Sequence, residues 1–360
     1  MLWRVTVQLW FWRSSVRSST KAERIANLMK KTKYFASRRE TPWDSTLRDN
    51  VQEFIRNEYL DDYYEKHPAL SESNEANLLN AFVPVCCPNC GSLKFTRKGF
   101  TSNGIQRYCC KDCGKRFNIL TGTLLDNHKI SISEWIEFCL NLFRHDSFSS
   151  TSANNKNSTT TTAYWTKKLF LLLEDYTEGI VLTGNVYIDE TYYNEAASNR
   201  TVRNGKELRG ISKNKYCIAM GFDGEKVYAF LEGMAKPTRE RTRDAFKNHI
   251  ARGSHLIHDR EKSHKVLVEE LELSEERYKA REIEKLPDKK NPLAPINRQC
   301  FMLKDFLNAH PGFNRKDLQG YLNIFCFMQN PPHDKLKKVE MLLRAIVYSQ
   351  KTLKYRDAWK

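Results

Sequence analysis

Two pairs of cysteines have the spacing of a metal site. Cys87 and Cys90 form one C-x2-C pair, and Cys110 and Cys113 form another after an interval of 19 residues. Each pair can turn two thiolates toward one ion, and two such pairs complete a tetrahedral site for Zn2+. A redox pair is the alternative, which the presence of two matched pairs disfavours. We therefore predict a structural zinc site, closed to catalysis because four thiolates leave no open position.

Two aspartates occur where the cutting and joining of phosphodiesters would need carboxylates. This chemistry uses two divalent ions about 4 Å apart. Asp189 falls within an expected strand, and Asp259 ends another. Because successive strand residues face opposite sides, Asp189 and Glu190 cannot both reach one ion, and Glu190 shares its face with Ile188. A lone Asp at a strand end is commonly a turn former, but two such residues predict a site for Mg2+ or Mn2+.

A third oxygen donor is expected on a late helix, although no Asp or Glu occurs from Asn291 to Lys304. Asn297 is the best donor there, a neutral ligand that Mg2+ or Mn2+ accepts. Lys304 follows two helical turns later on nearly the same face and could hold a DNA phosphate beside the site. Asn297 could instead cap the helix. The fallback ligands are Glu282, Glu284 and Asp288.

The elements expected after residue 184 would position these side chains. They are three strands, a helix, a strand, a helix, a strand and a helix, at 185–193, 215–224, 226–233, 238–250, 254–259, 263–273, 276–282 and 295–310. Three antiparallel strands followed by crossover units make a mixed sheet with helices on its faces. This is the order of an α/β RNase H-like fold, in which the first strand, the fourth strand and a late helix carry the metal ligands.

The segment 131–178 permits two interpretations. Helices are expected at 131–145 and 163–176, and between them thirteen of the sixteen residues 147–162 are Ser, Thr or Asn. That composition is typical of a flexible linker. Alternatively, the whole segment is a helix-turn-helix whose second helix begins near Ser158 and presents Lys167 or Lys168 to DNA.

The charge of the chain favours a polyanionic partner. Lys and Arg number 59 against 43 Asp and Glu, a net charge of +16 over 360 residues. A protein this basic commonly binds nucleic acid. Basic residues are dense at 94–116 and at 200–215, where a solvated basic surface is the alternative to DNA contact. The expected DNA-binding residues are Lys94, Arg97, Lys98, Arg107, Lys111, Lys167, Lys168, Arg203 and Arg209.

Residues 1–80 carry no recognisable chemistry. A helix is expected at 46–64, since Leu47, Val51 and Ile55 share a face. No apolar run approaches the roughly 20 residues that span a bilayer, and the start of the chain lacks a clear signal-peptide cleavage site. We therefore expect no membrane association. The clustering of the cysteines is typical of metal binding in a reducing compartment.

The ordered motifs resemble the zinc-ribbon DDE transposases of bacterial insertion sequences, the IS fifteen-ninety-five or ISXO-like group. The matching pieces span roughly residues 87–327 and read CPNCGS, QRYCCKDCGKRFNILTGT, YIDETYY, LIHDREKSH, PINRQCFMLKDFL and LQGYLNIFCF. The resemblance implies Asp189, Asp259, Asn297 and Lys304 as the catalytic set, the first three as magnesium ligands. It also favours the helix-turn-helix over the linker at 133–173.

The resemblance implies a transposase that binds the terminal inverted repeats of an insertion sequence, then cleaves DNA strands and transfers them to target DNA. It would act as a homodimer or larger assembly, in the bacterial cytoplasm at the nucleoid. The alternatives are a non-catalytic zinc-ribbon DNA-binding protein derived from a transposase, and a nuclease of RNA–DNA hybrids. The expected regions are an unassigned segment 1–80, a zinc ribbon 84–120, a helix-turn-helix-like region 131–178, a catalytic domain 184–312 and a basic helical region 313–360.

Overall fold

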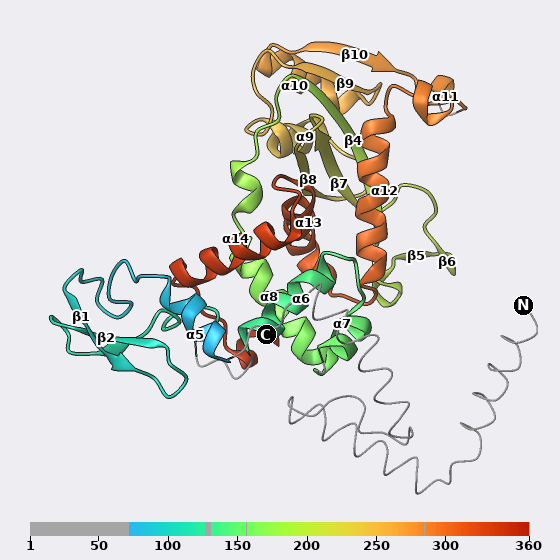
Figure 1. Cartoon of the computed structure of the whole chain (residues 1–360). Coiled ribbons are helices and arrows are strands. Elements are labelled where there is room, and N and C mark those ends of the chain that lie inside the picture. Colours follow the sequence, from blue (N-terminus) through green and yellow to red (C-terminus); the bar gives the residue numbers. More distant parts are fainter. Residues whose placement is uncertain (1–71, 127–130, 156, 284, 360) are drawn as a thin grey trace, which may run out of the picture.

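The structure, a computed structural model, describes residues 72–126, 131–155, 157–283 and 285–359 (Figure 1). The helix expected at 46–64 lies outside these residues. Within them, no helix is long and apolar enough to cross a membrane.

A small antiparallel sheet follows the first described helix, α5 (Glu72–Asn80). Its strands are β1 (Phe95–Phe100), β2 (Gln106–Cys110) and β3 (Arg116–Phe117), in the order β1-β2-β3. The rings of Phe95, Tyr108 and Phe117 pack together with centroids 5.5–5.6 Å apart. Asn80 fastens α5 to the β1–β2 loop, because its side chain donates to the carbonyl of Gly104 and accepts from the backbone N–H of Gln106.

Three helices occupy the segment that could have been a linker. They are α6 (Ile132–Leu142), α7 (Phe148–Asn154) and α8 (Thr159–Leu172). The hydroxyls of Ser147 and Ser158 cap α7 and α8 by accepting from backbone N–H groups of the first turn. Asn155 is buried, accepts from Asn141 and donates to the carbonyl of Glu134. Much of the Ser, Thr and Asn content therefore serves helix capping and a buried amide network.

A five-stranded mixed sheet forms the centre of the second half of the chain. Its strands are β4 (Asn185–Asn194), β7 (Lys215–Phe222), β8 (Val227–Met234), β9 (His255–Asp259) and β10 (Ser274–Tyr278). The order is β10-β9-β4-β7-β8. The pairs β4–β7 and β7–β8 are antiparallel, whereas β4–β9 and β9–β10 are parallel. This is the RNase H-like topology that the element order predicted.

The fifth strand differs from its predicted bounds. It was expected at 276–282, but β10 ends at Tyr278 and the short helix α11 (Ala280–Ile283) follows. The charged run offered no clear alternation from which to set the boundary. The parallel pairing of Ser274 with His255 sets the start of the strand instead.

Helices cover both faces of the sheet (Figure 1). Those on one side are α9 (Arg239–Phe246) and α10 (Lys265–Leu271), and those on the other are α12 (Ala294–Ala309) and α13 (Leu318–Gln329). Gly221 on β7 lets Phe246 of α9 come close, since a Cβ there would lie 3.2 Å from the ring. The active-site candidates lie where α12 crosses β4 and β7.

A last helix, α14 (Lys335–Tyr348), runs from the sheet domain back toward the small ribbon (Figure 1). It packs on α6 and α8. Lys338 is buried at its start and donates to the carbonyls of Phe327, Met328 and Asn330 at the end of α13. A positive charge at that helix end is favourable. The basic C-terminal region is therefore partly internal structure and not wholly a free basic surface.

Candidate active site and zinc centre

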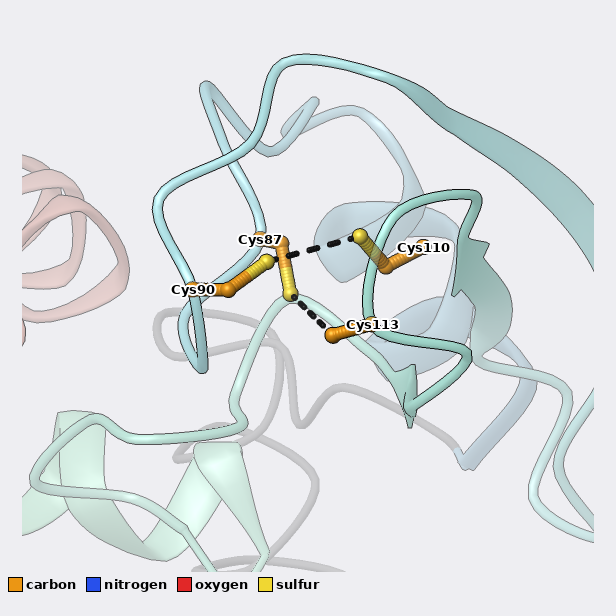
Figure 2. A group of neighbouring side chains, drawn as sticks. All are labelled: Cys87, Cys90, Cys110 and Cys113. Carbon is orange, nitrogen blue, oxygen red and sulfur yellow. Dashed lines mark hydrogen bonds between the residues drawn. The ribbon is translucent and has the colours of Figure 1, made fainter.

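The four cysteines of the two C-x2-C pairs converge (Figure 2). The Sγ atoms of Cys87 and Cys113 are 3.7 Å apart, and those of Cys90 and Cys110 are 3.6 Å apart. Zn–S bonds of about 2.3 Å in a tetrahedron place sulfurs about 3.8 Å from one another. The donor set and its spacing therefore fit one Zn2+.

Backbone N–H groups around the second pair favour the thiolate form that zinc requires. The N–H of Lys115 points at Cys113 and, as the largest of several causes, lowers the pKa of that thiol to about 6. The N–H of Cys113 lowers the pKa of Cys110 in the same way. Cys86 and Cys109 are not part of the cluster, and Cys109 instead contacts the carbonyl of Gly114.

Asp189 and Asp259 are neighbours across two parallel strands. Ile188 of β4 pairs with His258 of β9, and each aspartate is the next residue on its strand. Asp259 ends β9, where its Oδ1 accepts from the N–H of Glu261. Oδ1 of Asp189 accepts from the N–H of Glu190. The first and fourth strands in chain order therefore carry the two carboxylates, as the sequence predicted.

The electrostatics of this pair fit a divalent cation. Burial raises the pKa of Asp189 to about 7, and the charges of Glu190 and Asp259 raise it further in the same direction. Carboxylates that raise one another's pKa in this way are typical of a site that binds a cation. A bound Mg2+ or Mn2+ would relieve that repulsion, and oxygen ligands are the donors these ions prefer.

The late helix α12 faces Asp189. Cys300 of this helix is buried, and the charge of Asp189 contributes to raising the pKa of its thiol after burial, the largest cause. The charge of Lys304 acts on the same thiol in the opposite direction. Asn297 lies three residues before Cys300 and therefore on the same face of the helix. Asn297 and Lys304 are both exposed, so both side chains are accessible to DNA.

Asn297 does not cap α12. The residue that precedes the helix is Leu293, and the backbone N–H of Asn297 already bonds to the Leu293 carbonyl. The capping alternative is therefore wrong, and the side-chain amide is free of that task. Among the fallback ligands, Glu282 is ion-paired with Lys279 and Asp288 is exposed, while Glu284 lies outside the described residues.

Sequence reasoning missed three residues that lie beside the aspartates. Glu190 faces the opposite side of the sheet from Asp189, where its Oε1 lies 2.8 Å from Nε2 of His264. Nδ1 of His264 lies 2.9 Å from Nδ1 of His258 and 3.7 Å from Oδ1 of Asp259. Two histidines within seven residues around a strand-ending aspartate were the available signal.

The residues expected to bind DNA have different surroundings. Lys168 is buried and donates to the carbonyl of Leu124, and Lys167 is ion-paired with Asp317 at 3.2 Å. Both ammonium groups are thus engaged within the protein. The exposed members of the set are Lys94, Arg97, Lys98 and Lys111 on the ribbon and Arg203 and Arg209 near β4, while Arg107 is half-buried.

Arg203 belongs to a projecting hairpin between β4 and β7 (Figure 1). Its strands are β5 (Val202–Arg203) and β6 (Lys206–Glu207). Asn204 and Gly205 form the turn, both with positive φ (51° and 74°), as a tight hairpin requires. The basic loop predicted between the first two strands is therefore a small ordered hairpin.

Comparison with known families identifies the domain that contains the sheet. Residues 181–330 match the ISXO2-like transposase domain. This part of the chain is therefore similar to that transposase family, which confirms the resemblance predicted from the motifs.

One curated relative is an uncharacterised protein in the transposable element ISH50 of Halobacterium salinarum. The two are 29% identical over 151 residues, which are 40% of this chain and 49% of the relative. The chain thus spans about half the length of this relative.

Among solved structures, similarity was found to a chain of the simian T-cell lymphotropic virus intasome in complex with the PP2A regulatory subunit B56 gamma. The identity is 10%, the TM-score is 0.28, and the match covers 54% of this chain and 67% of that one. A pre-cleavage Mos1 transpososome matches with 11% identity and a TM-score of 0.26, over 60% of this chain and 79% of that one.

Proposed function

We propose that the protein is a DDE-type DNA transposase, a polynucleotidyl transferase that cleaves DNA at the ends of an insertion sequence and joins those ends to target DNA. The observation that carries the proposal is the adjacency of Asp189 and Asp259 on parallel strands, inside a domain of a transposase family.

Asp189, Asp259 and Asn297 would hold two Mg2+ or Mn2+ ions in this proposal. The ions supply charge that activates the attacking oxygen and stabilises the leaving one. The two carboxylates would supply charged oxygen ligands to the ions, and Asn297 would add a neutral oxygen. Lys304, seven residues along the same helix face, holds a neighbouring phosphate of the DNA. Water would attack a phosphodiester at each end of the element and displace its 3′-oxygen. The freed 3′-hydroxyl would then attack a phosphodiester of target DNA and displace the 3′-oxygen there.

The zinc ribbon and the helices α6–α8 would bind the terminal inverted repeats. Zn2+ on the four cysteines keeps the ribbon folded, and the exposed basic residues of β1 and its flanks contact phosphates. The hairpin of β5 and β6 adds Arg203, with Arg209 close behind. Lys167 and Lys168 are not included, because their ammonium groups already have partners within the protein.

Transposition requires both ends of the element in one complex, so we propose that a homodimer or a larger assembly forms on DNA. The protein would act in the bacterial cytoplasm at the nucleoid, where its substrate lies.

The test is metal-dependent cleavage by the purified full-length chain. The substrate is DNA carrying the ends that flank the gene, with Mg2+ or Mn2+, and Asp259→Ala is assayed in parallel. Nicking or strand transfer by the wild type alone supports the proposal. Tight binding by both proteins without cleavage would instead support a non-catalytic DNA-binding protein. Cleavage confined to RNA–DNA hybrids would support a hybrid nuclease.

A further inference from the structure

A chain of four ionisable side chains runs through the sheet beside the two aspartates. Glu190 of β4 contacts His264 at 2.8 Å, and His264 contacts His258 of β9 at 2.9 Å. Nε2 of His258 lies 3.5 Å from Oε2 of Glu275 on β10. Both histidine side chains are almost fully buried, at 0% and 2% exposure. Three strands and the 3-10 turn η4 (Lys262–His264) therefore meet in one polar network.

The contacts of His264 hold both sides of its ring. Nε2 lies against Glu190 of β4, and Nδ1 lies against His258 of β9, so the ring bridges these two strands. The contact of His258 with Glu275 is looser, because Nε2 of His258 is buried without a hydrogen-bond partner. One of the two aspartates borders the same ring, because Oδ1 of Asp259 lies 3.7 Å from Nδ1 of His264.

We propose that His264 is a positioning residue of the active site, a buried imidazole that ties Glu190 to β9 and holds the Asp259 carboxylate in the direction needed to share a metal with Asp189. This inference rests on the proposed function. It also assigns a role to Glu190, which follows Asp189 in β4 but does not bind the metal. Glu190 holds His264 on the face of the sheet opposite to Asp189. Removing a residue that contacts and orients a metal ligand commonly lowers metal affinity or activity by about 10–100-fold.

The same atoms could be read as a metal site of their own, since His258, Asp259 and His264 offer ligand atoms within 4.8 Å of one another. The distance between the two Nδ1 atoms argues against that reading. Tetrahedral nitrogen ligands at about 2.1 Å from a zinc ion lie about 3.4 Å apart, whereas these lie 2.9 Å apart, at hydrogen-bond distance.

The test compares His264→Gln with His255→Gln in the full-length chain. His255 is also a histidine of β9 that contacts a carboxylate, Glu276, but its side chain is 36% exposed and it has no contact with either aspartate. Mn2+ affinity is measured by electron paramagnetic resonance of the free ion, without DNA. Cleavage is then measured against Mn2+ concentration, and thermal unfolding and zinc content are recorded for each variant.

We expect the Mn2+ dissociation constant of His264→Gln to rise about 10–100-fold, with cleavage largely restored at saturating Mn2+ and with His255→Gln like the wild type. A purely structural role would lower the unfolding temperature without moving the Mn2+ affinity of the folded protein. An unchanged Mn2+ affinity in folded His264→Gln overturns the inference and leaves the proposed function intact. A second zinc ion per chain, lost in His264→Gln, overturns it in favour of a metal site.

Glu190→Leu provides a second variant if His264→Gln does not fold. It removes the carboxylate that contacts Nε2 of His264 and so releases the ring from β4. It should also weaken Mn2+ binding, and an unchanged affinity counts against the inference. Failure of the wild type itself to bind Mn2+ would be a different result, because it removes the proposed function and the inference together.

Discussion

Asp189 and Glu190 are adjacent in the chain, yet their carboxylates serve opposite faces of the sheet. Asp189 faces α12, where its charge adds to burial in raising the pKa of the Cys300 thiol. Glu190 faces η4, where its Oε1 lies 2.8 Å from Nε2 of His264. The alternation of a strand explains the separation. The pair therefore divides two tasks: one carboxylate is available to a cation, and the other is held by a protein side chain.

The first prediction concerns the stability of the protein without Mg2+ or Mn2+. The pKa of Asp189 in the folded state is raised to about 7 from 3.8. A group shifted in this direction stabilises the fold fully below about pH 4, and this contribution is lost as the pH rises through about 7. The loss has an upper limit of about 4 kcal/mol. Between pH 5 and pH 8 the loss is at most about 3 kcal/mol, and urea unfolding of the full-length protein at these two pH values measures it.

Asp189→Asn is the matched control for that measurement, because the amide has nearly the same shape and cannot ionise. Its stability should change less between the two pH values than that of the wild type, and Mn2+ should stabilise only the wild type at pH 8. If the unfolding free energies of the two proteins changed equally with pH, ionisation of Asp189 would not be the cause of the loss of stability.

A second prediction concerns Asn297. Asn297→Ala should lower cleavage by at least about 10-fold, because the active site loses an oxygen donor. Asn297→Asp should keep activity and need less Mg2+, since a carboxylate is the stronger ligand. Asn308→Ala, an exposed change at the other end of α12, is the control. Full activity of Asn297→Ala across a Mg2+ titration would remove Asn297 from the metal site.

A third prediction concerns zinc. Cys90→Ser should abolish stoichiometric zinc binding, whereas Cys86→Ser, outside the cluster, should retain it. Because zinc binding provides about 10 kcal/mol or more toward folding in comparable small modules, the ribbon of the first variant should become sensitive to protease while the sheet domain stays resistant. Zinc analysis and limited proteolysis measure both effects. Equal zinc content in the two variants would refute the four-cysteine site.

The elements and the metal ligands differ in how far the sequence could predict them. The hairpin of β7 and β8 has strong apolar runs around Asp223-Gly224, so its bounds were close to those observed. Asp189 and Asp259 could be chosen because strand alternation and strand order are local rules. For the cysteine pairs, the C-x2-C spacing itself indicates the geometry of a zinc site.

Contacts between distant segments could not be predicted in the same way. Nothing local in the sequence says that His264 meets Glu190, 74 residues away. The burial of Lys168 depends on Leu124, which belongs to the segment after the ribbon. The helices at 147–162 were hidden because serine and asparagine favour caps and linkers alike, and only their partners distinguish the two.

The last prediction separates Lys168 from the exposed ribbon residues. Lys168 is 4% exposed, burial lowers its pKa to about 8, and its ammonium donates to the Leu124 carbonyl at 2.6 Å. Lys168→Met keeps the bulk but leaves that carbonyl without its partner, so the free energy of unfolding should fall by about 1–3 kcal/mol with DNA affinity unchanged. Arg97→Ala should instead leave the free energy of unfolding unchanged and weaken DNA binding. The slope of log affinity against log salt concentration should become shallower by about 0.9, because one phosphate contact is lost. Filter binding at several salt concentrations and urea unfolding measure both variants. Weaker DNA binding by a fully stable Lys168→Met would mean that Lys168 leaves its buried position to contact DNA, and α8 would then be the recognition helix.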